Sequence, residues 1–111
     1  MKDRYERITQ DLVFGAADTV KTATVHFRGE VKNLALRMPN FTNSVTGTLA
    51  LNDEDGITFY SQAAIPENAD SPYTVERYFS GGLITVSLTL SGAPGGTGGT
   101  ATLVLHAKGE R

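Results

Sequence analysis

The feature that most constrains this chain is the alternation of apolar and polar side chains along most of its length. The clearest run is LITVSLTL, residues 83–90, in which Thr85, Ser87 and Thr89 alternate with apolar residues. Neighbouring residues of a β-strand point to opposite faces of a sheet, so such runs are typical of strands that are buried on one side. The β-branched residues common in these runs fit a half-buried pleated surface. The pattern predicts an all-β chain.

Eight candidate strands begin near residues 6, 20, 32, 44, 57, 73, 83 and 100. In the last of them we expect Val104 and His106 to face outward, and the flanking leucines to face the core. A helix is least excluded over residues 30–37, where Val31, Leu34 and Ala35 could share one helical face. The regular spacing and the scarcity of helical periods predict a single antiparallel β-sandwich, either jelly-roll or Ig-like, of about eight strands.

The length and the charge pattern predict one domain with a short N-terminal extension. A chain of 111 residues is large enough to bury a core, and it contains no cysteine, so disulfides and thiolate metal sites are excluded. We expect a charged arm over residues 1–7 (MKDRYER) and the sandwich over residues 8–108. The start has no apolar stretch typical of a signal peptide, and no apolar run approaches the ~18 residues of a membrane span. We therefore expect an intracellular product without a membrane partner.

One long stretch of the chain, residues 78–107, contains no Asp, Glu, Lys or Arg. Charged side chains normally protect the open edges of β-sheets, so an uncharged pair of strands invites pairing with other chains. Two explanations remain open from the sequence. The strands could bury a face against a neighbouring subunit, or they could be central strands whose outer Thr-rich face is simply hydrated.

Motifs that would carry chemistry are incomplete. The run GGTGG lacks the lysine of a P-loop and is followed by a strand rather than a helix. The acidic turn NDEDG, residues 52–56, lacks the full ligand set of an EF-hand and reads as a hairpin turn. The two histidines, His26 and His106, could meet across a sheet, but no further ligand is identifiable. We expect no catalytic residue, metal or cofactor.

The charge distribution argues against nucleic acid as a partner. The net charge is −2, and residues 1–37 carry seven basic and five acidic side chains, an excess of only +2. Such an excess is too small for a groove that follows a phosphate backbone. Residues 53–77 carry six acidic side chains and one basic one, a balance of −5. This asymmetry could orient neighbouring subunits, although acidic residues also collect in solvated turns.

Two stretches, KNLALRMPNFTNSVTGTLALNDEDG and TVSLTLSGAPGGTGGTATLVLHAK, resemble small β-sandwich proteins encoded among the head and tail genes of tailed bacteriophages. The resemblance runs over residues 20–108. It implies a non-enzymatic virion structural protein that is assembled in the bacterial cytoplasm. The leading hypothesis is a capsid decoration or cement subunit that clamps neighbouring capsid proteins. The implied partners are the major capsid protein or other virion proteins, and further copies of the chain.

The resemblance supplies no site residues, so the candidate contact residues come from the aromatic side chains. Large aromatic rings contribute much of the contact area in protein interfaces and can stack on sugars, although sandwiches also use them for packing. Two other functions stay open: a head–tail connector or tail component, and a carbohydrate- or surface-binding module. The candidate contact residues are Tyr5, Phe41, Tyr60, Tyr73, Tyr78 and Phe79.

Overall fold

The computed structural model describes residues 4–27, 29–79 and 82–109, and these residues form eight β-strands without a helix. The prediction of an all-β chain is confirmed. Residues 30–37, where a helix was least excluded, lie within a strand. The strands are β1 (Arg4–Phe14), β2 (Val20–His26), β3 (Gly29–Met38), β4 (Thr46–Asn52), β5 (Thr58–Pro66), β6 (Ala69–Phe79), β7 (Leu83–Leu90) and β8 (Gly99–Gly109).

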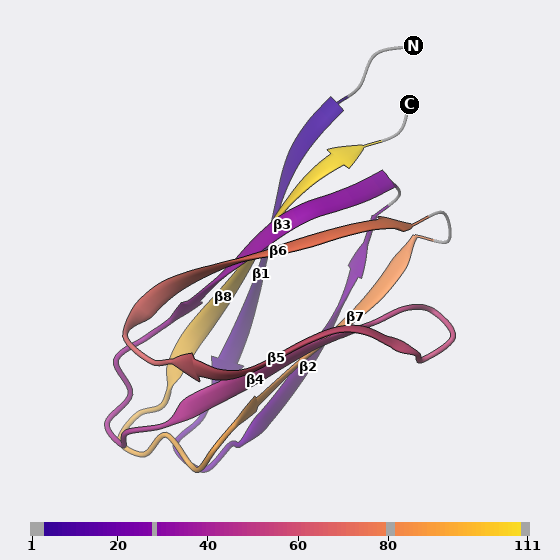
Figure 1. The fold of residues 1–111 in the computed structure, drawn as a ribbon. Helices are drawn as coiled ribbons and strands as arrows, with labels where there is room; N and C mark the ends of the chain where they lie inside the picture. Colours follow the sequence, from indigo (N-terminus) through magenta and orange to yellow (C-terminus); the bar gives the residue numbers. More distant parts are fainter. Residues whose placement is uncertain (1–3, 28, 80–81, 110–111) are drawn as a thin grey trace.

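The strands form two four-stranded sheets that pack face to face (Figure 1). One sheet has the order β1-β8-β3-β6 and the other has the order β2-β7-β4-β5, and all neighbouring strands are antiparallel. The pairs β1–β8, β2–β7, β3–β6 and β4–β5 are those of one long hairpin, folded over so that its arms alternate between the sheets. This arrangement is a jelly roll rather than an Ig-like sandwich.

The first strand begins earlier than the sequence predicts. Residues 4–7, placed in the charged arm by the sequence, belong to β1 and pair with residues 106–109 of β8. Residues 1–3 lie outside the described part of the chain. β1 therefore includes residues 4–7, because their backbone groups pair with those of residues 106–109 at the end of β8.

The uncharged segment supplies a central strand to each sheet. β7 lies between β2 and β4, and β8 lies between β1 and β3. The backbone groups of both strands are therefore paired on both sides, and neither strand needs charged residues to protect an edge. For β8 the fold favours the explanation that it is a central strand. The neighbouring strands β1 and β3 carry charged side chains in its place.

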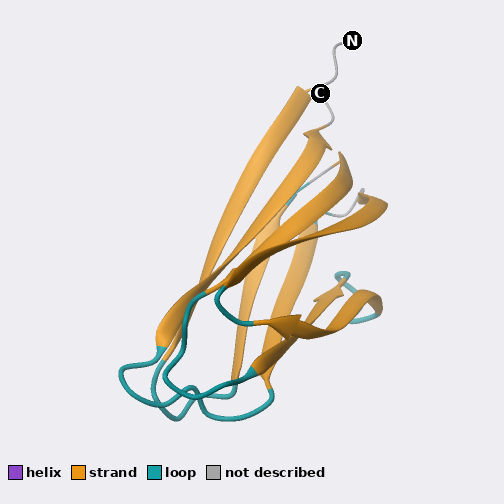
Figure 2. Ribbon diagram, turned by 60° about the vertical axis from the view of Figure 1, so that its left-hand side comes forward, coloured by secondary structure: helices purple, strands orange, loops and turns teal. Residues whose placement is uncertain are grey.

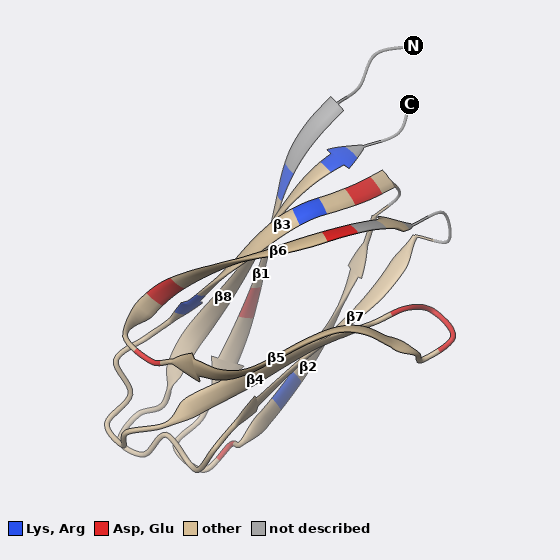
Figure 3. Ribbon diagram, viewed as in Figure 1, with Lys and Arg blue, Asp and Glu red and all other residues tan. Residues whose placement is uncertain are grey.

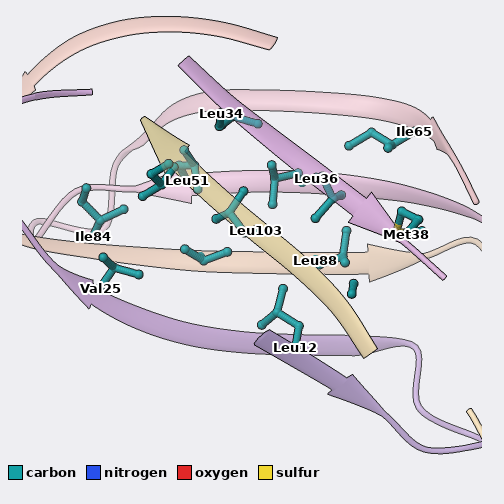
Figure 4. Packing of buried hydrophobic residues seen from close by; sticks show 14 of the residues in the cluster. Leu12, Val25, Leu34, Leu36, Met38, Leu51, Ile65, Ile84, Leu88 and Leu103 are labelled. Atoms are coloured by element: carbon teal, nitrogen blue, oxygen red, sulfur yellow. The ribbon is translucent and has the colours of Figure 1, made fainter. Parts of the chain in front are cut away.

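The space between the sheets holds a continuous hydrophobic core (Figure 4). The alternation predicted from the sequence is confirmed in β7, where Ile84, Val86 and Leu88 are fully buried. Burying one such side chain contributes about 1.5–3 kcal/mol relative to leaving it exposed. At the end of the core, the rings of Phe14 and Phe41 meet edge to face, with centroids 6.2 Å apart.

One side chain of β8 departs from the prediction. Val104 was expected to face outward into solvent, but only 1% of its surface is exposed. It does lie on the outer face of its sheet, opposite Thr9 of β1 and Ala35 of β3. Because β8 is a central strand, side chains from both neighbouring strands cover Val104, which alternation within a single strand does not reveal.

The connections at one end of the sandwich are tied to one another (Figure 2). The carboxylate of Glu67 accepts hydrogen bonds from the backbone N–H groups of Phe41 and Val45, both at 3.0 Å. Asn43 donates its backbone N–H to Pro94 and its side-chain amide to Ala93, at 2.8 and 3.0 Å. The glycine-rich 91–98 connection is therefore hydrogen-bonded to neighbouring connections.

Candidate interaction surface

The outer face of the β2-β7-β4-β5 sheet is built from rows of small hydroxyl side chains. Strand register places Thr22, Ser87, Ala50 and Ser61 in one row across the four strands. The pattern arises because each strand buries every second residue, and the residues between them are mostly Thr or Ser. We call this surface the threonine face. It comprises Val20, Thr22, Thr24, His26, Thr46, Thr48, Ala50, Asn52, Thr58, Ser61, Leu83, Thr85, Ser87 and Thr89.

None of the residues that define the threonine face is Asp, Glu, Lys or Arg, and charges occur only at its borders (Figure 3). At one corner, Asp18 and Lys21 form an ion pair of 3.1 Å. The pKa of Asp18 lies below its usual value, chiefly because its carboxylate accepts the N–H of Gly15 at 2.8 Å, and also because of Lys21. Interfaces are depleted of charge at their centres, and the threonine face shares this lack of charge with contact surfaces.

The acidic connection 53–57 borders the opposite end of this sheet. The Oδ1 atom of Asp53 accepts hydrogen bonds from the N–H groups of Asp55 and Ile57, both at 3.0 Å. The carboxylate thus closes its own hairpin turn, as expected for an Asx-type turn. Among the described residues, no group of three or more His, Cys, Asp or Glu side chains could hold a metal ion.

The outer face of the other sheet carries charges that are paired locally. Arg37 of β3 and Asp70 of β6 lie 3.5 Å apart, and Thr102 donates a hydrogen bond of 2.9 Å to Asp11. Figure 3 shows these charges along β1, β3 and β6. We call this surface the charged face. The sandwich therefore has two different outer faces, one charged and one uncharged.

The charged face is hollowed over β3, β6 and β8. A shallow depression of about 520 Å³ lies over the small side chains of Ala35 and Pro72, with Asn33, Thr74 and His106 around it. These polar groups could donate and accept hydrogen bonds from a small polar ligand. They contain no acidic partner for the imidazole that would make an acid–base pair.

The two histidines lie on opposite faces of the sandwich. His26 belongs to the threonine face and pairs in register with Leu83, whereas His106 lines the hollow on the charged face. The two sheets and the core separate them. The hypothesis that they meet across a sheet is wrong, because β2 and β8 belong to different sheets.

The predicted contact residues are dispersed over the molecule. Phe41 is only 4% exposed and lies in the core. Tyr60 of β5 and Tyr73 of β6 are partly buried and pack against the core, and burial raises the pKa of Tyr60. Tyr78 of β6 exposes 51% of its surface and pairs in register with Glu30 of β3 in the same sheet. The side chains of Tyr5 and Phe79 lie outside the described part of the structure.

Sequence reasoning found the parts of the threonine face but not the face itself. The outward positions of Thr22, Thr24, Thr85 and Ser87 follow from alternation within single strands. Their assembly into one surface depends on the strand order β2-β7-β4-β5. The signal in the sequence is the repeated Thr at every second position in three separated strands.

The fold occurs in proteins of several kinds. No family model matches the chain, and no curated protein matches its sequence. A chain of the cyanophage Pam1 capsid asymmetric unit is 20% identical, with a TM-score of 0.55, over 98% of this chain and 84% of that one. A Bacillus endospore appendage, from a family of disulfide-linked pili, is 13% identical, with a TM-score of 0.56, over 97% and 89%.

A family two carbohydrate esterase from Cellvibrio japonicus also shares the fold. It is 11% identical, with a TM-score of 0.50, over 98% of this chain but 35% of the esterase. At such identities the likeness is one of fold. The chain is a β-sandwich of a type found in a phage capsid, a bacterial appendage and part of an enzyme. No helix in the described residues is long and apolar enough to cross a membrane.

Proposed function

We propose that this chain is a non-enzymatic structural protein of a phage particle, and specifically a decoration subunit that joins neighbouring capsid proteins. The observation that carries the proposal is the contrast between the uncharged threonine face and the charged face. A contact surface without charge avoids the cost of removing ions from water. The charged face would remain in solvent and keep the particle soluble.

The fold and the resemblance of the sequence support the same function. The Pam1 capsid chain shows that a sandwich of this shape and size occurs in a phage capsid. The pilus chain is a component of disulfide-linked pili, a mode of linkage that this chain cannot use because it contains no cysteine. Any assembly that it forms is therefore held by something other than disulfides, and the contacts of a broad, uncharged face could supply this.

The copy number of the chain in purified particles tests the position that we propose. Quantitative mass spectrometry should give on the order of hundreds of copies per particle, because a decoration subunit follows the symmetry of the whole shell. A value of about six or twelve would instead indicate a connector or a tail ring, because such rings follow the symmetry of one vertex. Absence from purified particles would reject the virion role.

A charge placed on the threonine face tests the contact surface. Thr48 of β4 is exposed at the centre of this face, so Thr48→Lys should leave the fold intact. An unpaired charge in the contact should weaken binding to undecorated particles by at least about tenfold, which corresponds to about 1.4 kcal/mol. Binding can be measured by co-sedimentation with particles that lack the chain.

The matched control is Thr9→Lys, since Thr9 is an exposed threonine on the charged face. Binding by this variant should stay within about twofold of the wild type, because surface charges away from a contact have small effects. Equal loss in both variants, or loss in Thr9→Lys alone, would contradict the assignment of the contact to the threonine face.

A further inference from the structure

The four edge strands of the sandwich are not equally protected against pairing. β5 carries a β-bulge at Ala64, which has a φ of 57°, and ends at Pro66. β6 carries a bulge at Glu76, with a φ of 54°, and contains Pro72. Bulges and prolines interrupt the row of backbone donors and acceptors that another strand would need. This side of the sandwich is therefore blunted.

The opposite side of the sandwich has two regular edges. β1 and β2 pair with their neighbours in unbroken register. β1 carries charged side chains, among them Arg7 and Asp11, which protect an edge. β2 contains no proline, and Lys21, its one charged residue, is bound to Asp18. β2 is thus the strand with the fewest obstacles to pairing.

The backbone of β2 presents its free hydrogen-bonding groups at even-numbered residues. On the inner side, Thr19 accepts a hydrogen bond from Leu90 and Phe27 donates one to Gly82, both at 2.7 Å. These odd-numbered residues fix the alternation, because successive residues of a strand direct their N–H and C=O groups to opposite sides. The groups of Val20, Thr22, Thr24 and His26 therefore point away from β7 toward the open edge.

We propose that two copies of this chain pair through β2, antiparallel and centred on Ala23. A two-fold interface requires a patch that is complementary to itself, and Thr22-Ala23-Thr24 is symmetric about its centre. This register places Thr22 opposite Thr24 of the second copy, and Val20 opposite His26. It uses every free N–H and C=O group of the strand, and paired threonines across strands are favourable.

The pairing joins two sheets into one of eight strands. The threonine faces of the two copies then lie side by side on the same surface, which doubles the uncharged area that a further partner can contact. The pairing itself depends only on the backbone and side chains of β2. It holds or fails independently of a role in a virion, and Thr48, which tests that role, lies on β4 outside it.

A single cysteine can test both the pairing and its register, because the chain has no cysteine of its own. In the proposed register the two Ala23 residues form a non-hydrogen-bonded pair, whose Cα atoms lie about 4.5 Å apart, within the range of a disulfide. Purified Ala23→Cys under a glutathione redox buffer should form a disulfide-linked dimer, followed on non-reducing gels. Circular dichroism would confirm that the variant is folded.

The matched control places the cysteine on the blunted edge. Ala63→Cys on β5 should form dimers at least about tenfold more slowly, because nothing raises the local concentration of its thiol. In the background of Ala23→Cys, Thr24→Pro removes a donor of the open edge without removing a β2–β7 hydrogen bond, and should abolish the rapid dimerisation.

Three results would overturn the proposal. Ala23→Cys could form dimers no faster than Ala63→Cys, as it would if a strand of another protein were the true occupant of this edge. Rapid dimerisation could persist in the Thr24→Pro background. Finally, Thr22→Cys could form dimers rapidly while Ala23→Cys forms none, which would centre the pair on Thr22 and contradict the proposed register.

Discussion

At the scale of single residues, Tyr60 shows how an aromatic side chain closes an edge of the sandwich. Its ring packs against the core from β5, and Tyr73 does the same from β6 of the other sheet. Burial raises the pKa of Tyr60 above 10.0, and the nearby phenol of Tyr73 adds to this shift. The neutral phenol is therefore favoured in the folded chain, and the unfolded chain releases the proton more readily.

This shift predicts how stability depends on pH at the alkaline end. The contribution of Tyr60 is fully present below pH 10 and is lost as pH rises through the higher pKa of the folded state, because the unfolded chain then binds fewer protons. We expect Tyr60→Phe to make the loss of stability above pH 10 less steep. Urea unfolding at pH 8–11 would measure this effect. Equal slopes for wild type and Tyr60→Phe would contradict the prediction.

At the scale of elements, the bulge in β5 predicts that substitution by glycine has different effects on stability at two adjacent residues, Ala64 and Ala63. Ala64 has a φ of 57°, a left-handed conformation that costs an L-residue about 1–2 kcal/mol. Ala64→Gly should therefore be neutral or stabilising by up to about 1 kcal/mol, because glycine adopts this conformation freely. Ala63, its exposed neighbour, has no positive φ.

The neighbour provides the control for this prediction. Glycine in the interior of a strand is destabilising, so Ala63→Gly should lower the free energy of unfolding by about 0.5–1 kcal/mol. Chemical denaturation of both variants would measure the difference. If Ala64→Gly destabilised the chain as much as Ala63→Gly, the positive φ at Ala64 would not be a source of strain.

The elements also show how far the sequence predicts this fold. Alternation placed β2, β4 and β7 well, because each alternates between the core and an outer face. In β8 it failed at Val104, which is buried on the outer face of its sheet. β3 remained ambiguous with a helix because its register shifts between Val31 and Asn33, which breaks the alternation. The strand order was not predictable, because an alternating strand fits beside any other. The sequence therefore predicted a sandwich, and the structure distinguished a jelly roll from an Ig-like fold.

The candidate surface was harder to predict than the fold for the same reason. Aromatic residues were chosen by residue type, and this choice placed a core residue, Phe41, among the candidate contacts. The threonine face consists of residues from strands that are distant in the sequence, so only the strand order brings them together. A surface of this kind depends on topology and has no local motif.

At the scale of the whole molecule, the two ends of the chain close the sheet. β1 pairs with β8 along its whole length, from Arg4 opposite Gly109 to Phe14 opposite Gly99. β8 is a central strand only because of this pairing. Without β1, β8 would be an edge strand, and this edge carries no charged side chain from residue 99 to residue 107. Such an edge is a template for pairing with other chains.

Removal of β1 tests this dependence. A chain that begins at Gly15 should aggregate, because it exposes the uncharged edge of β8 and removes the buried side chains of Leu12 and Phe14. Truncation of either Leu12 or Phe14 to alanine would by itself lower the free energy of unfolding by about 2–5 kcal/mol. Light scattering and thioflavin T fluorescence should rise with concentration for the truncated chain and stay flat for the full chain.

A charge on the exposed edge separates the two causes of aggregation. Thr102→Lys in the truncated chain places a lysine on β8 without restoring any core contact, and lysine on an edge strand opposes pairing. We expect this variant to be no more stable than the truncated chain, yet to aggregate markedly less. If it aggregated as much as the truncated chain, the lost core contacts alone would drive association. A truncated chain that stayed monomeric with native-like near-UV circular dichroism would show that β8 needs no partner at this edge.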